Sequence, residues 1–257
     1  LGIPLDAIAI LDNFCWCSSD EPERLAQLKA AARGCYDGAT GFETPFISGK
    51  DSMYNDFRGY DEENNPVKVS VPPTLLVSSI GIHPDVTKAV SLDAKIEGDL
   101  VYLIGENREE LGGSEYCAYL GISGGTVPSL DISAMKARYQ RLTNAILHDL
   151  VASAQPVTHG GLAVALAKVA IGGRVGMDVT LTGELRPDVL LFSETLGRFI
   201  VTVDPDKKRS FELAMGPDAT LIGRVTGKNL QITGPSLRIS VPVSDLESAY
   251  KKPFGGY

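Results

Sequence analysis

Residues 44–55 of the chain read TPFISGKDSMYN, and residues 7–13 read AIAILDN. Each stretch holds a short apolar run that is typical of a buried strand, and each run gives way to polar residues. Between them, residues 18–34 begin with small polar and acidic residues and a proline, and continue with leucine and alanine at helical spacing. This predicts a helix that ends near Gly34. The sequence therefore predicts a strand, a helix and a second strand, with Asp12 at the carboxyl end of the first strand.

The remainder of the chain mixes helices and strands without a strict strand-helix-strand repeat, which favours an α+β fold over a doubly wound one. We expect residues 56–65 to form an exposed polar excursion, because they are rich in turn formers. The boundary between two domains is predicted near residue 88, which gives domains of residues 1–88 and 89–257. Strands are expected at 67–71, 74–82, 100–104, 177–181, 199–203 and 219–225, helices at 129–153, from 160 and at 207–215, and a hairpin with a short helix after 230.

Composition narrows the class of protein. The 257 residues carry a formal net charge of -8, without a cluster of Lys and Arg, which argues against nucleic acid and anionic membranes as partners. The chain has neither a long apolar run nor a signal-like start. Because it opens with Leu1 rather than Met, we expect an excised or processed piece. The four cysteines have neither disulfide-framework nor zinc-site spacing, which indicates free thiols in the cytoplasm.

The predicted loop at residues 48–52 is the strongest candidate for a ligand-binding segment. Gly49 permits close approach of the backbone to a ligand. The Lys50 ammonium can meet phosphate oxygens, and Asp51 could hold Mg²⁺. Ser52 and Asn55 add short hydrogen-bonding groups. The spacing is not that of a P-loop, and a polar turn between strands explains the residues equally well.

Three further segments are candidates. Asp12 at a strand end could contact a Mg²⁺-nucleotide, although an Asx turn or helix cap is the commoner explanation. Residues 158–162, which contain His159 and Gly160-Gly161, could bind an anion at a helix N-terminus or form a tight packing turn. Residues 192–195 contain Ser193-Glu194, which could face a cleft or cap a helix.

These segments occur together in one order. Residues 10–16, 44–55, 159–165 and 191–194 resemble the C-terminal half of the synthetase subunit of the phosphoribosylformylglycinamidine synthase family. The resemblance covers nearly the whole chain. It implies the α+β fold of aminoimidazole ribonucleotide synthetase-like proteins, with the C-terminal part of an N-type, ATP-binding domain at residues 1–88 and a complete C-type domain at 89–257.

The resemblance also implies a reaction. Such an enzyme uses ATP to activate the formyl amide oxygen of formylglycinamide ribonucleotide, and glutamine-derived ammonia then displaces phosphate to give the amidine in purine biosynthesis. ATP and Mg²⁺ are the implied cofactors of the parent enzyme. The implied partners are the substrate, a glutaminase subunit or domain in an amidotransferase complex, and the rest of the synthetase. The implied location is cytoplasmic.

Residue roles carry over one position at a time. Asp12 and Gly49 match nucleotide-contacting residues, and Ser52 matches a substrate-contacting serine. Lys50 stands where the family often has an Asn associated with Mg²⁺, so we expect Lys50 to meet phosphate, and metal ligands stay unassigned.

The family's His-Asp-x-Ser-Asp-Gly-Gly motif has become QPVTHGG at residues 155–161, and both acids are gone. The family's catalytic His lies upstream of this chain, so no residue here is predicted to be catalytic and the chain alone should be inactive. The alternative is a non-catalytic scaffold or structural nucleotide-binding module of that enzyme. A hydrogenase-maturation or selenophosphate-synthesising relative fits the loop at 48–52 poorly.

Overall fold

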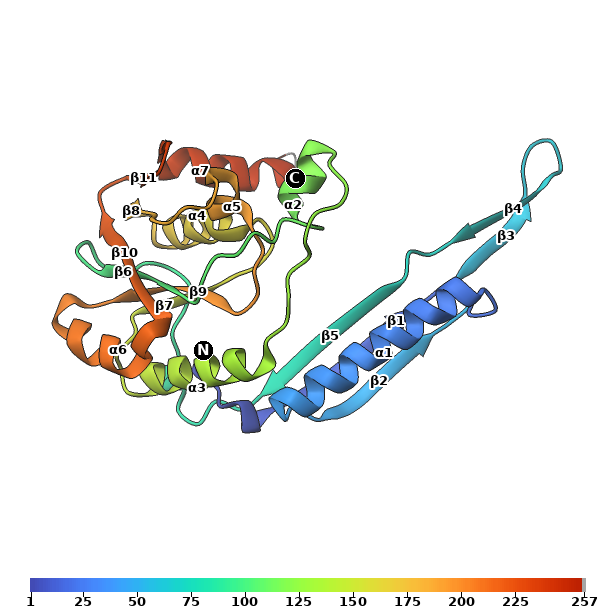
Figure 1. Cartoon of the computed structure of the whole chain (residues 1–257), viewed down its shortest axis with the longest axis horizontal. Coiled ribbons are helices and arrows are strands. Elements are labelled where there is room, and N and C mark those ends of the chain that lie inside the picture. The colour runs from blue at the N-terminus through green and yellow to red at the C-terminus, as the bar shows by residue number, and fades with distance from the viewer. Residues whose placement is uncertain (256–257) are drawn as a thin grey trace. The chain divides into compact units, whose positions relative to one another are not determined.

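The computed structural model describes residues 1–255 and divides them into two compact units (Figure 1). The N-terminal unit is Ile3–Pro84. The C-terminal unit begins at Asp85 and includes Leu1–Gly2. The family-based boundary between residues 88 and 89 remains a prediction; it falls at the end of a short 3-10 turn, Val86–Lys88.

The N-terminal unit consists of one long helix on a small sheet and a separate hairpin. Strands β1 (Ile8–Cys15) and β2 (Phe46–Ser52) are parallel, and β1 is antiparallel to β5 (Thr74–Gly81), which gives the order β2-β1-β5. Helix α1 (Pro22–Phe42) connects the two parallel strands and runs along the sheet (Figure 1). Strands β3 (Asp56–Tyr60) and β4 (Pro66–Ser70) form the hairpin.

Several expectations for this unit were wrong. Strand β1 continues to Cys15, so Asp12 lies inside a strand rather than at its end. Residues 48–52 are not a loop, because they pair with β1 up to Ser52. Helix α1 passes Gly34 and ends at Phe42, where Glu43 takes a left-handed conformation. The polar residues 56–65 are largely exposed, as expected, but residues 56–60 pair with β4 as strand β3. In each case the hydrogen bonds of the backbone continue beyond the residues that carry the apolar pattern.

The C-terminal unit is a seven-stranded mixed sheet with helices on both faces. Its strand order is β12-β11-β8-β10-β6-β9-β7, in which only the β11–β8 pair is parallel among the described residues. The strands are β6 (Leu100–Ile104), β7 (Ser153–Val157), β8 (Gly176–Thr180), β9 (Arg198–Val203), β10 (Ala219–Thr226), β11 (Asn229–Gly234) and β12 (Leu237–Pro242). The helices are α2 (Glu115–Leu120), α3 (Ile132–Leu147), α4 (Gly161–Gly173), α5 (Pro187–Phe192), α6 (Lys208–Met215) and α7 (Val243–Lys251).

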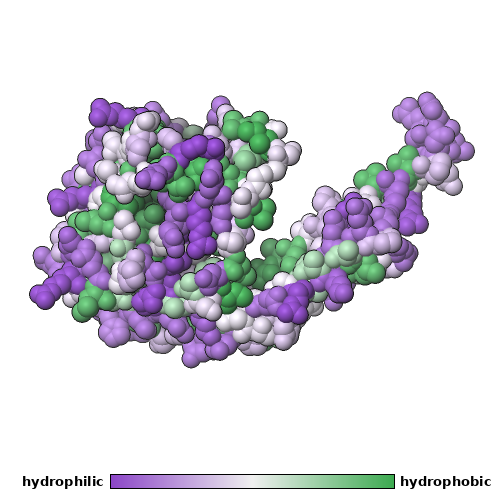
Figure 2. Space-filling model, viewed as in Figure 1, coloured by the Kyte–Doolittle hydropathy of each residue, from purple (hydrophilic) through white to green (hydrophobic). Residues whose placement is uncertain are grey.

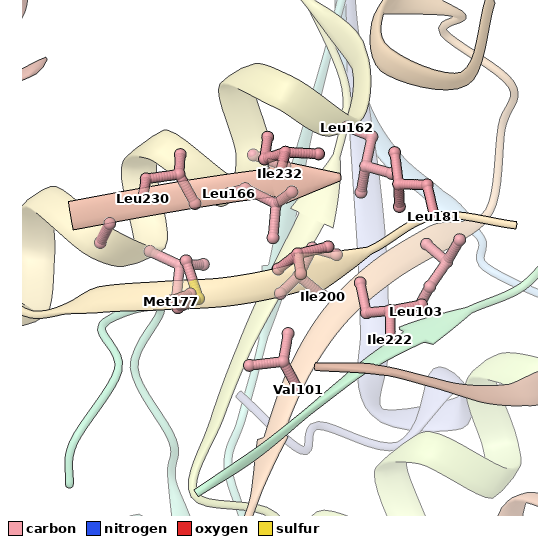
Figure 3. Close-up of a cluster of buried hydrophobic side chains, with 14 of the residues drawn as sticks. Val101, Leu103, Leu162, Leu166, Met177, Leu181, Ile200, Ile222, Leu230 and Ile232 are labelled. Atoms are coloured by element: carbon pink, nitrogen blue, oxygen red, sulfur yellow. The ribbon is translucent and has the colours of Figure 1, made fainter. Parts of the chain in front are cut away.

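Two apolar cores flank this sheet. Helices α4, α5 and α7 cover one face, where Leu162 and Leu166 of α4 pack on the strands without any exposed surface (Figure 3). Helices α3 and α6 cover the other face around Tyr102 and Phe211, whose ring centroids are 4.9 Å apart. Burial is the dominant stabilising contribution in such a layered domain. The α+β class predicted from the sequence is confirmed.

The strands at 100–104, 177–181, 199–203 and 219–225 are confirmed within a few residues, as are the helix at 207–215 and the terminal hairpin and helix. The helix expected at 129–153 is shorter. Asp131 caps its start, and it stops at Leu147 before Asp149, which has a positive φ. Strand β7 and helix α5 were not predicted. Strand β7 contains Pro156, which is tolerated because β7 lies at the sheet edge.

The surface is mixed in polarity (Figure 2). It is strongly hydrophilic at the end of the β3–β4 hairpin, where residues 61–65 read DEENN. Within residues 1–255, no helix has both the length and the apolar character that a membrane crossing requires.

The core on the α4 face should dominate the stability of the C-terminal unit. Leu166→Ala removes a side chain with no exposed surface, and we expect it to lower the free energy of unfolding by about 2–5 kcal/mol. Leu213→Ala is the matched control, because Leu213 is 84% exposed, and its effect should stay within about 0.5 kcal/mol. Urea unfolding followed by circular dichroism measures both; equal midpoints would contradict the assigned core.

Candidate functional site

The pairing of β1 with β2 brings Asp12 and Gly49 together. They are register partners in the parallel pair. A Cβ added at Gly49 would lie 2.5 Å from Oδ1 of Asp12, so the carboxylate lies directly over the glycine. Only a residue without a side chain leaves Asp12 in this position. The two residues that the sequence predicts to contact a nucleotide are therefore adjacent in space.

A cavity of about 600 Å³ adjoins this pair, and we call it the helix-side cavity. It lies between α1 and the strands β1 and β2, and its lining residues are Asp12, Phe14, Leu28, Ala32, Cys35, Tyr36, Ala39, Thr40, Phe46, Asp51 and Met53. Burial raises the pKa of the Cys35 thiol, and the nearby Asp12 carboxylate raises it further. This volume is in the range of small-molecule sites.

Lys50 and Ser52 do not share that side of the sheet. Lys50 pairs with Asn13, and Ser52 pairs with Cys15. Side chains alternate between the two faces along a strand, so Lys50 and Ser52 lie on the face opposite to Asp12. Neither residue lines the helix-side cavity. The four predicted site residues thus form two pairs, one on each face of the sheet.

Asn55 proves to be a structural residue. Its Nδ2 donates to the carbonyl oxygens of Ser52 at 2.8 Å and Trp16 at 3.3 Å. The Trp16 amide also donates to the Ser52 carbonyl at 2.8 Å. These bonds hold the ends of β1 and β2 together after the ladder stops, and they fix the register that places Asp12 over Gly49.

In the C-terminal unit, the Gly160-Gly161 segment contacts the segment that carries Glu194. Oε1 of Glu194 accepts hydrogen bonds from the amides of Gly160 at 2.8 Å and Glu115 at 2.9 Å. These amides stand at the N-termini of α4 and α2, where unpaired N–H groups favour an anion. The predicted anion position at the start of α4 therefore holds the carboxylate of Glu194. His159, 81% exposed, lies 3.8 Å from Oε2 of Glu194 and 3.6 Å from Glu115.

Gly160 and Gly161 make this junction possible. Both have positive φ values, of 81° and 67°. A Cβ at Gly161 would lie 2.7 Å from backbone atoms of Phe192 and Ser193. The glycines thus serve the close packing of the start of α4 against residues 192–193, which was one of the two explanations left open by the sequence.

Arg198 stabilises the segment that carries Glu194. The sequence did not predict this role. Its guanidinium donates to the carbonyls of Thr195 at 2.9 Å and Ser193 at 2.6 Å and also to the side chain of Asn107. Burial lowers the pKa of Arg198 to about 10, against the opposing effect of Glu110 and Glu194, so it stays charged at neutral pH. The sequence offers no signal for this role beyond a lone Arg at the start of an apolar strand.

We next consider the side chains that could bind a metal ion. The described residues contain no group of three or more His, Cys, Asp or Glu that could hold a metal ion. The cysteines Cys15, Cys17, Cys35 and Cys117 are all free.

The seven-stranded mixed sheet with helices on both faces makes the C-terminal unit an α+β domain. The family model described as "AIR synthase related protein, C-terminal domain" matches residues 97–234, more than half of the chain. The chain belongs to this family.

Relatives and solved structures extend the likeness to both units. The chain is 35% identical to "Phosphoribosylformylglycinamidine synthase subunit PurL" of Methanocaldococcus jannaschii over 97% of its own length, and 35% identical to the protein of the same name of Limosilactobacillus fermentum over 95%. It spans about a third of the length of these relatives, 34% and 32%. The predicted family resemblance is confirmed.

Among solved structures, Thermotoga maritima PurL complexed with ATP matches with a TM-score of 0.66 and 17% identity, over 96% of this chain and 38% of that one. The same protein complexed with FGAR gives a TM-score of 0.68 and 18% identity, over 93% and 39%. Escherichia coli HypE, a hydrogenase maturation protein, gives 0.64 and 15%, over 92% and 74%. At these identities the likeness shows the fold.

The Glu194 junction is testable by stability. Glu194→Ala leaves two backbone N–H groups without their acceptor, and we expect it to lower the free energy of unfolding by about 1–3 kcal/mol. Glu115→Ala is the control, because that side chain is 64% exposed and lies 3.6 Å from Nδ1 of the exposed His159; its effect should be about 0.5 kcal/mol or less. Chemical denaturation measures both variants. A larger loss in the Glu115 variant would contradict the assigned junction.

Proposed function

We propose that the chain is part of an ATP-dependent carbon–nitrogen ligase that converts formylglycinamide ribonucleotide to formylglycinamidine ribonucleotide with glutamine-derived ammonia, in purine biosynthesis. The observation that carries the proposal is the 35% identity, over nearly the whole chain, to relatives named as the PurL subunit of that synthase. The T. maritima neighbours, complexed with ATP and with FGAR, supply the ligand classes. A cytoplasmic location, a glutaminase partner and Mg²⁺ for the parent enzyme belong to the same proposal.

Four residues receive roles in this proposal. Asp12 and Gly49 contact the nucleotide, which their adjacency in the β1–β2 pair supports. Lys50 offers its ammonium to a phosphate group, and Ser52 contacts the substrate. Both lie on the other face of the sheet, so the strand β2 separates two binding surfaces. Positioning of phosphoryl groups and stabilisation of their charge provide most of the catalysis in such reactions.

A second candidate is a non-catalytic scaffold role for the C-terminal unit. It is favoured by one observation: Glu194 fills the anion position at the start of α4. A carboxylate there repels a phosphate from the same backbone amides. The missing acids of residues 155–161 point the same way. The parent protein can be a ligase while this unit is structural.

ATP binding tests the nucleotide assignment. We expect weak binding of ATP to the chain in calorimetry, reduced about tenfold in Asp12→Ala, which corresponds to the loss of one hydrogen bond to a charged group. Gly49→Ala should weaken binding similarly, because its Cβ displaces the Asp12 carboxylate. Binding that is unchanged in both variants would remove the pair from the nucleotide site.

Gly34→Ala is the matched control for the glycine variant. Gly34 lies within α1, and an added Cβ would meet nothing within 4 Å. We expect it to leave ATP affinity unchanged and to stabilise the helix by about 0.5–1 kcal/mol.

Turnover provides a separate test. With ATP, ammonia and formylglycinamide ribonucleotide, we expect the chain alone to form no amidine, because it spans only a third of its relatives. Product can be followed by mass spectrometry. Amidine formation by the chain alone would contradict the proposal that the reaction needs the rest of the synthetase.

A further inference from the structure

A second cavity, of about 600 Å³, lies within the C-terminal unit. Strands β6 and β8 are both antiparallel to β10, so the last residues of β6 and β8 lie at the same end of the sheet as the first residues of β10. Residues at this end of the three strands line the cavity together with helix α5. We call it the strand-end cavity. Its volume is in the range of small-molecule sites.

The buried part of the lining is apolar. It consists of leucine and isoleucine side chains that belong to the core on the α4 face: Leu103, Leu181, Leu190 and Ile222. Leu103, Leu181 and Ile222 lie close together in Figure 3. A ligand that covers these side chains is stabilised by apolar burial.

The charged groups at the strand-end cavity select neither an anion nor a cation. None of the described residues that line it is Lys, Arg or His, so an anion has no direct cationic contact. The Asp218 carboxylate lines it but already accepts hydrogen bonds from the guanidiniums of Arg138, at 3.2 Å, and Arg141. The Glu106 side chain is 70% exposed and lies 3.6 Å from Arg108. Because a charge that is buried without a partner costs free energy, this lining favours an uncharged ligand.

Three side chains supply hydrogen-bonding groups to such a ligand. Oδ1 of Asn107 accepts from Arg198, which orients the amide and leaves Nδ2 as a donor. The hydroxyls of Thr182 and Thr220 can donate or accept. Within the part of the chain that the structure describes, neither hydroxyl makes a hydrogen bond to another residue, and nor does Nδ2 of Asn107. A carboxamide, which has both donors and an acceptor, matches these groups.

We propose that the strand-end cavity binds an uncharged small molecule with an apolar body and a carboxamide-like edge. The amide edge bonds to Asn107, Thr182 and Thr220, and the apolar body covers the leucine and isoleucine side chains. The proposal does not rest on the proposed function, which assigns its ligands to residues of the N-terminal unit.

Indole-3-carboxamide and indole-3-carboxylate are the probes, because they share a two-ring body and differ in charge at neutral pH. Calorimetry with the whole chain measures both dissociation constants. We expect the carboxamide to bind about tenfold more tightly, because the carboxylate finds no cation in the lining. Absence of saturable binding of the carboxamide, or a carboxylate that binds as tightly as the carboxamide, overturns the proposal.

Thr220→Trp tests the location of the bound probe. Thr220 lines the cavity as the register partner of Leu103, and a strand accommodates an aromatic residue, so the Trp ring fills the cavity. We expect the dissociation constant of the carboxamide to rise about tenfold. Leu221→Trp is the matched control, because Leu221 is the next residue of β10, faces the other side of the sheet and is 42% exposed. It should leave the affinity unchanged, and an equal response of the two variants overturns the proposal.

Thr182→Lys supplies a second measurement that does not depend on filling the cavity. Thr182 is exposed, so the change adds a cation to the lining without disturbing the core. We expect tighter binding of the carboxylate, which lowers the preference for the carboxamide several-fold. Thr126→Lys, the same change at an exposed position outside the lining, should leave the preference unchanged. Equal preferences in the two variants overturn the assigned lining. None of these measurements involves ATP, so either outcome leaves the proposed function unaffected.

Discussion

The parallel pairing of β1 with β2 is the constraint on which the candidate site depends. It sets Asp12 opposite Gly49 and leaves the carboxylate over a residue without a side chain. It also fixes which side chains face α1 and which face away. A shift of one residue in this register would exchange the two faces. The hydrogen bonds of Asn55 to the ends of both strands oppose such a shift.

The C-terminal unit depends on a second constraint, a carboxylate that accepts hydrogen bonds at two helix N-termini. The Glu194 carboxylate satisfies backbone amides at the starts of two helices. The buried Arg198 holds the carbonyls of the segment that carries Glu194. A fully buried guanidinium is stable only when its donors are paired, so this segment has one favoured conformation. That rigidity suits a structural unit as well as it suits one wall of a binding site.

Local patterns predicted most elements of the C-terminal unit, since apolar strands such as β6 and β9 are buried almost throughout. These patterns failed for strands that are held by hydrogen bonds to a neighbouring strand and are not buried. Strand β2 is largely exposed and polar, so its residues read as a loop. The adjacency of Asp12 and Gly49 could be inferred only from the family resemblance. The positions of Glu194 and Arg198 depend on contacts between segments distant in sequence, which periodicity does not reveal.

The sequence by itself determined the α+β class, the family and the residue types available for binding, because apolar periodicity and ordered motifs are local properties of the chain. Only the tertiary structure decided that residues 48–52 are a strand, that Lys50 and Ser52 lie opposite to Asp12, and that Glu194 occupies the start of α4. The physical reason is that strand register and helix-end contacts are fixed by hydrogen bonds between distant segments. The segment at 44–55 therefore kept its chemical importance and changed its geometry, from one loop to a strand with two different faces.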